Sequence, residues 1–123
     1  MRHLTLLAFA SVLVLTSVQP SHAESKTVSP AVMEKAWADY GALDTEMKKI
    51  YQKALIKMDN SEAREKFTDA QNAFEKYRAL QGEFVVFGAK DEVTSKLLRA
   101  KSYSETTEAR IAELKSWVAS SSK

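Results

Sequence analysis

The stretch SEAREKFTDAQNAFEKYRALQGEFVVFG, residues 61–88, decides the fold. Its apolar side chains recur mostly at spacings of three and four, which places them on one stripe of an α-helix. The carboxylates of Glu62 and Glu65 favour a helix start at the turn-forming cluster 59–61. Gly88 is typical of the position just past a helix end. The residues of the predicted stripe are Ala63, Phe67, Ala70, Phe74, Tyr77, Phe84 and Phe87.

Similar stripes lie on both sides of this stretch. Before it, Ser29 and Pro30 form an N-cap followed by proline at the first helical position, and Gly41 lies inside the pattern as a point where the helix can bend. After it, a third pattern begins at Asp91-Glu92 and carries the polar Ser104 in its apolar seam. The first stripe contains Met33, Trp37, Tyr40, Met47, Ile50, Tyr51, Ala54, Leu55 and Met58, and the third contains Val93, Leu97, Ala100, Thr107, Ile111, Leu114 and Val118.

These patterns predict an all-α fold, an up-down-up antiparallel bundle of three long helices. Each helix of roughly 27 residues would be about 40 Å long, and short connections make successive helices antiparallel neighbours. In two antiparallel helices, residues at equal distances from the connecting turn should lie side by side. Counting from the two turns places Arg78 at the level of Asp44, and Arg110 at the level of Asp69. We expect at least one of these arginines to pair with the acid at its level.

The first residues have the three parts of a secretory leader. A short positive start is followed by an apolar run from Leu4 to Val18, and small residues end at Ala23. We expect cleavage before Glu24, which removes residues 1–23 and leaves one helical domain, 24–123, with frayed ends. The alternative is an uncleaved membrane anchor, but the run is shorter than the roughly 20 residues that a span needs. The prediction is a periplasmic or secreted protein without a stable membrane anchor.

Removal of the leader changes the available chemistry. His3 and His22 are the only histidines and leave with it, and the chain has no cysteine. We therefore expect no metal site or cofactor built on imidazole or thiolate. Of the 18 Lys and Arg residues, Arg2 is also lost, so 17 remain against 16 Asp and Glu. This balance argues against a nucleic-acid partner, which selects a strongly basic face.

An enzyme is not expected. Asp44 and Glu46 lie two residues apart and thus on different helix faces, so they do not form a catalytic carboxylate pair. The sequence also lacks the spacing of di-iron bundles, calcium loops and phosphate-binding glycine loops.

Three segments carry a resemblance to a known family. They are LDTEM at 43–47, followed by Tyr51; AQNAFEKYR at 70–78; and TEARIAEL at 107–114. Together they resemble the secreted lysozyme-inhibitor LprI-like family, over roughly residues 43–118. The resemblance implies a helical fold and, for some members, inhibition of lysozyme. The residues that carry it are Asp44, Tyr51, Gln71, Tyr77, Arg78, Thr107 and Arg110.

The chain departs from the family at its cysteines. Members commonly carry one cysteine shortly after the Tyr-Arg pair and another ahead of the Thr-x-x-Arg motif. This chain has Gly82 and Ser102 in those regions. The disulfide that the resemblance implies is therefore absent.

Two groups of residues are candidate sites. The motif residues have two interpretations, a structural network that satisfies buried polar groups or a ligand-facing patch, and the first is favoured because Arg and Gln beside an apolar seam usually serve the packing. The second group is Phe84-Val85-Val86-Phe87, since four consecutive apolar residues cannot all face one seam. It is either buried under the N-terminal segment or forms a dimer or partner interface.

The loop 88–91, with Lys90, is the candidate recognition element beside this cluster. Two functional hypotheses follow. One is an envelope protein-binding module whose partner is a lysozyme-type muramidase. The other is a structural or adaptor protein of the envelope, present as a homodimer.

Overall fold

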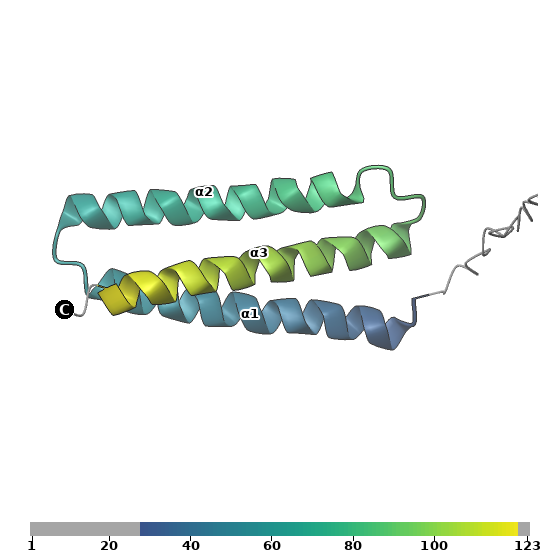
Figure 1. Cartoon of the computed structure of the whole chain (residues 1–123), viewed down its shortest axis with the longest axis horizontal. Helices are drawn as coiled ribbons and strands as arrows, with labels where there is room; N and C mark the ends of the chain where they lie inside the picture. The colour runs from purple at the N-terminus through teal and green to yellow at the C-terminus, as the bar shows by residue number, and fades with distance from the viewer. Residues whose placement is uncertain (1–27, 121–123) are drawn as a thin grey trace, which may run out of the picture.

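The structure, a computed structural model, describes residues 28–120, and the leader prediction lies outside this part. Three helices follow in order: α1 (Pro30–Ile56), α2 (Ser61–Val86) and α3 (Glu92–Ser120). They run up, down and up, with the start of α1 at the same end of the bundle as the connection between α2 and α3 (Figure 1). The predicted all-α three-helix bundle is confirmed.

Polar caps set the helix boundaries where the sequence predicts them. The Ser29 side chain accepts a hydrogen bond from the Val32 N–H at 3.2 Å, and the Asn60 side chain accepts one from the Ala63 N–H at 3.0 Å. These bonds satisfy donors that the first turn of a helix leaves unpaired. After α2, Gly88 adopts φ of 82°, a conformation that strongly favours glycine.

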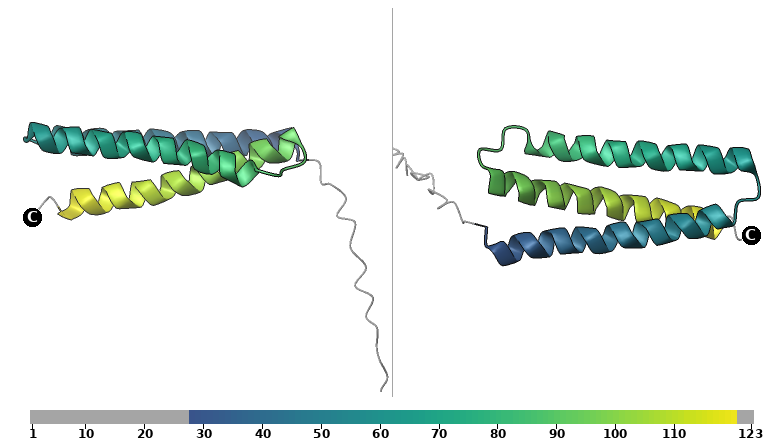
Figure 2. Two further views of the ribbon diagram at one scale, coloured as in Figure 1. Left: turned by 90° about the horizontal axis from the view of Figure 1, so that it is seen from above. Right: turned by 180° about the vertical axis from the view of Figure 1, so that it is seen from behind.

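Helix α3 holds the bundle together. It packs closely along both α1 and α2, whereas α1 and α2 meet mainly through long side chains. Figure 2 shows α3 displaced to one side of the plane that contains α1 and α2. The core is a single thin seam. It contains Met47, Ile111 and Leu114, with Leu43, Ile50, Tyr51, Phe67 and Phe74 packed around them.

The predicted stripe of α2 is only half correct. Phe67 and Phe74 pack on the core, but Tyr77, Phe84 and Phe87 are exposed. The buried positions between and beyond them are instead polar or small, namely Gln71, Arg78 and Gly82. A count of apolar side chains misses this face because these residues are buried through hydrogen bonds or close helix approach, not through apolar area.

The two helical glycines form a matched pair for testing the packing. A Cβ at Gly41 would meet no atom within 4 Å, and α1 continues through this position without interruption. A Cβ at Gly82 would collide with the Tyr103 ring and come within 3.3 Å of Cγ of Arg99. Gly82 thus lets α2 and α3 approach closely.

Opposite effects are therefore expected from the same substitution. Gly41→Ala should raise the free energy of unfolding by about 0.5–1 kcal/mol, because alanine is the better helix former. Gly82→Ala should lower it by about 1 kcal/mol, because overpacking outweighs that gain. Urea denaturation followed by circular dichroism measures both, and a stabilising Gly82→Ala would contradict the packing described.

Candidate functional site

Arg78 lies at the centre of a buried polar network. Its Nη1 donates to Oδ1 of Asp44 at 2.9 Å and to Oγ1 of Thr107 at 3.1 Å, so one guanidinium joins all three helices. The ion pair between Arg78 and Asp44 confirms the pairing predicted from the level of the two residues. Lys48 binds the other oxygen of Asp44 at 2.7 Å from the solvent side.

Aromatic rings enclose the same guanidinium. The Cζ atom of Arg78 lies 5.3 Å from the ring centroid of Tyr40, 5.5 Å from that of Phe74 and 5.9 Å from that of Tyr103. Rings at these distances attract a cation through their quadrupole. Trp37 completes the cluster, with edge-on contacts to Tyr40 at 5.9 Å and to Tyr103 at 6.0 Å between centroids.

The direction of the pKa shift of Asp44 agrees with an ion pair between Asp44 and Arg78. Burial alone would raise the pKa of Asp44, but hydrogen bonds from Lys48 and Arg78 outweigh it and hold the pKa of this carboxyl below its usual value. Burial, partly offset by the nearby Arg78 cation, raises the pKa of the Tyr40 hydroxyl. Asp44 therefore stays ionised and Tyr40 stays protonated at neutral pH.

Arg110 forms the second half of the network and does not pair with Asp69. Its Nε donates to Oε1 of Gln71 at 3.0 Å, its Nη1 binds Glu113 at 3.0 Å, and its Cζ lies 5.6 Å from the Phe74 centroid. The partner on α2 is thus two residues, about half a helical turn, from the predicted one. Phe74 separates the two arginines, so both cations share one aromatic neighbour.

The two motif tyrosines differ in their surroundings. Tyr51 donates to Oγ1 of Thr68 at 3.1 Å and stacks on Phe67 with centroids 5.0 Å apart. Tyr77 points away from the network and is 53% exposed. In the described residues, no buried side-chain nitrogen or oxygen lacks a hydrogen-bond partner. These contacts favour the structural interpretation of Asp44, Gln71, Arg78, Thr107 and Arg110, while a ligand-binding role for them stays a prediction.

Gly82 and Ser102, which lie in the regions where the resemblance implies cysteines, are both buried. Gly82 faces the Tyr103 ring, and Ser102 precedes Tyr103 in the sequence of α3. The aromatic cluster around Tyr103 fills the space at this level. This cluster was not predicted, although Gly82, four residues after Arg78 on the same face of α2, was a sequence signal for close packing there.

The tip of the bundle, residues 84–91, is the second candidate site. Phe84 is 71% and Phe87 89% exposed, while Val85 and Val86 are half-buried. No part of residues 28–120 buries Phe84 and Phe87, and the prediction that the N-terminal segment covers them concerns residues that lie partly outside the described ones. The four residues do not share one seam, because α2 ends at Val86 and Phe87 has extended backbone. In Figures 1 and 2 the connection from α2 to α3 arches outward beyond the helix end.

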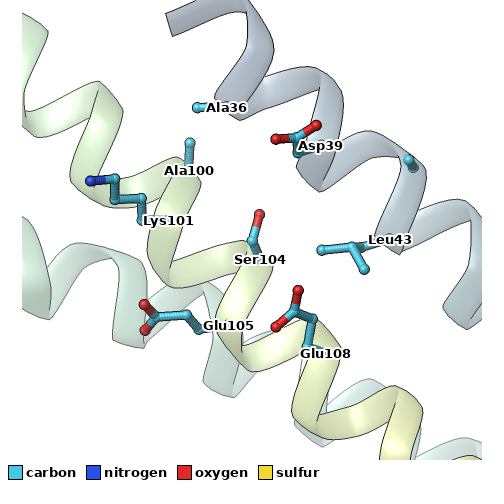
Figure 3. Close-up of a pocket in the computed structure, with 9 residues that line it drawn as sticks. Ala36, Asp39, Leu43, Ala100, Lys101, Ser104, Glu105 and Glu108 are labelled. Atoms are coloured by element: carbon cyan, nitrogen blue, oxygen red, sulfur yellow. The ribbon is translucent and has the colours of Figure 1, made fainter. Parts of the chain in front are cut away.

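A groove of about 690 Å³ between α1 and α3 was not predicted. Its walls carry Asp39, Ser104 and Glu108, which point toward the space between the helices (Figure 3). The polar Ser104 in an apolar seam was the sequence signal for it. Small side chains such as Ala100 leave the space open, but within the described residues no group of three His, Cys, Asp or Glu is arranged to hold a metal ion.

Comparison with known proteins agrees with the motifs. The family model described as Lysozyme inhibitor LprI matches residues 21–114, which include α1, α2, both connections and most of α3. No curated protein and no solved structure shows significant similarity to the chain. The matched region contains the whole polar network and the tip. This chain therefore belongs to the lysozyme inhibitor LprI family.

Proposed function

We propose that this protein is exported to the cell envelope, where it inhibits a lysozyme-type muramidase by binding it with the tip of the bundle, residues 84–91. The observation that carries the proposal is the pair Phe84 and Phe87, two large aromatic side chains exposed beside a protruding loop in a chain of an inhibitor family. Exposed aromatic residues beside polar ones are typical of protein-binding surfaces.

The chemistry of the tip fits a muramidase cleft. Enzymes that hydrolyse glycosidic bonds carry two carboxylates across the scissile bond. Lys90 is an exposed cation in the arched loop, and it has no ion pair within residues 28–120. An ammonium group placed near those carboxylates would be attracted to them, and the phenylalanines would exclude substrate from the cleft rim. Inhibition is then steric, with Lys90 supplying charge complementarity.

Export rests on the leader. Cleavage before Glu24 would leave residues 24–29 ahead of α1, so processing would remove no residue of the three helices. Among residues 28–120, none of the helices is apolar over a length sufficient to cross a bilayer. The mature protein would therefore act in the periplasm or outside the cell, where muramidases reach the cell wall.

The experiment is a cell-wall lysis assay with purified residues 24–123. Chicken-type, goose-type and invertebrate-type lysozymes are each measured against micrococcal walls with increasing inhibitor. The expected result is saturable inhibition of at least one type at micromolar concentration, without loss of inhibitor helicity. Full lysis by all three types at a hundredfold excess of inhibitor would overturn the proposal.

One observation favours the second hypothesis, a structural or adaptor role with self-association. The exposed apolar surface of α2 continues along the helix well beyond the tip. A tip that binds a partner does not explain this extension.

A further inference from the structure

The apolar surface on the outside of α2 forms a regular line. Tyr77 and Leu80 are 53% and 56% exposed, and they precede the two exposed phenylalanines at alternating spacings of three and four. Such spacing places side chains on one helix face. That face is opposite the one that buries Gln71 and Arg78, and in Figures 1 and 2 no other helix covers it. We define the outer stripe as Ala73, Tyr77, Leu80, Phe84 and Phe87.

Charged residues border the outer stripe along one edge. Asp69, Lys76 and Glu83 follow each other at intervals of seven residues with alternating sign. All three are exposed, and within residues 28–120 none of them has an ion pair. An apolar line of about 20 Å with a charged edge at heptad spacing is the pattern by which two helices pair.

We propose that the outer stripe pairs with the outer stripe of a second copy of this chain, with the two α2 helices antiparallel and the two-fold axis beside Leu80. In a two-fold interface the same surface is used by both copies and must complement itself. In this register the small Ala73 lies opposite the large Phe87 of the second copy, and Tyr77 lies opposite Phe84 of the second copy.

The charges select this register. Edge residues on the same side face each other in an antiparallel pair, so Lys76 lies opposite Glu83 of the second copy, and symmetry creates this contact twice. Sliding one helix by seven residues would place Lys76 opposite Lys76 and Asp69 opposite Glu83, with like charges in contact. Sliding by fourteen would place Phe84 opposite the small Ala63 and Leu80 opposite Lys66, which removes most of the apolar contact.

The inference stands independently of the proposed function, although the two surfaces share Phe84 and Phe87. If both hold, self-association and muramidase binding exclude each other. Their failures are separable, since the oligomeric state is measured without any lysozyme present.

The test is sedimentation equilibrium of residues 24–123, with a charge exchange across the interface. The wild type should be a dimer at tens of micromolar. Lys76→Glu and Glu83→Lys should each raise the dimer dissociation constant about tenfold, because each places two like-charge pairs in contact. The double exchange should restore the wild-type value to within about threefold, because the pairs are re-formed with opposite orientation. Both side chains are exposed and neither has an ion pair within residues 28–120, so helicity should be unchanged.

Crosslinking is a second test, and it also detects a dimer that dissociates readily. The chain has no cysteine, so Leu80→Cys introduces one thiol at the proposed two-fold axis, and Ala109→Cys on the exposed face of α3 is its matched control. A short bismaleimide should join Leu80→Cys chains into dimers and leave Ala109→Cys monomeric. A wild type that stays monomeric above 100 μM, equal crosslinking of both variants, or no rescue in the double exchange would each overturn the proposal.

Discussion

Replacing Arg78 with methionine is expected to lower the free energy of unfolding by about 3 kcal/mol. The guanidinium joins Asp44 on α1 to Thr107 on α3, and it lies among three aromatic rings. Methionine keeps much of the apolar stem but removes every hydrogen bond. Asp44 is then left in a low-dielectric seam with only Lys48 as its partner. For a domain of this size such a loss lowers the Tm by roughly 10–20 °C.

Urea denaturation followed by circular dichroism at 222 nm measures the effect. Arg64→Met, at an exposed position near the start of the same helix, is the matched control, and it should change stability by less than about 0.5 kcal/mol. The double variant Asp44→Leu, Arg78→Met should cost less than the sum of its single variants, because no unpaired charge remains. A loss below 1 kcal/mol for Arg78→Met would contradict the central role of this network.

Exchanging the tip residues is expected to weaken muramidase inhibition about a hundredfold. Two contacts of the hot-spot type, an aromatic anchor and a charge in a carboxylate-lined cleft, are removed in Phe87→Ser, Lys90→Glu. Lys90→Glu alone should cost about tenfold, because it places like charges in contact. The measurement is the inhibitor concentration that halves the lysis rate, for whichever lysozyme type the wild type inhibits.

The opposite end of the bundle supplies a matched control. Ile56 is 74% exposed, and it precedes the exposed Lys57 at the turn between α1 and α2. Ile56→Ser, Lys57→Glu therefore makes the same change in polarity and charge about one helix length from the tip. It should leave inhibition unchanged. Equal losses at both ends would show that the tip is not the binding surface.

The helix pattern of the chain was predictable from sequence because local chemistry determines it. Ser29, Asn60 and Gly88 satisfy helix ends through contacts within a few residues, so the sequence contains the whole interaction. The pairing of Arg78 with Asp44 was also predictable, since short turns and a fixed rise per residue determine which levels meet.

The orientation of α2 was not predictable in the same way. Its sequence carries two stripes, and the more apolar one points partly into solvent. Arg78 and Gln71 can be buried because they have hydrogen-bond partners on other helices. The periodicity of α2 alone contains no information about those partners, so it cannot identify the buried face. For the same reason Arg110 was placed beside Asp69, whereas the amide of Gln71 is within its reach.

The sequence predicted which residues form the candidate site, but not how they are arranged in space. The cluster from Phe84 to Phe87 and the loop with Lys90 were recognised from composition, but burial and exposure were equally compatible with four apolar residues in a row. The structure distinguishes them: Phe84 lies on the exposed face of α2, Phe87 follows the helix end at Val86, and the two valines between them are half-buried. The groove between α1 and α3 depends on the distance between two helix surfaces, which no local pattern encodes.

Hydrogen exchange of the mature chain, alone and with an inhibited lysozyme in excess, is the most direct test of the proposed function. The amides of 84–93 form the tip and the start of α3, so a complex built on Phe87 and Lys90 should slow their exchange. The turn 57–60 at the other end should exchange as in the free protein. Slowed exchange confined to that turn or to the groove walls near Ser104, or no change anywhere at saturating lysozyme, would contradict binding through the tip.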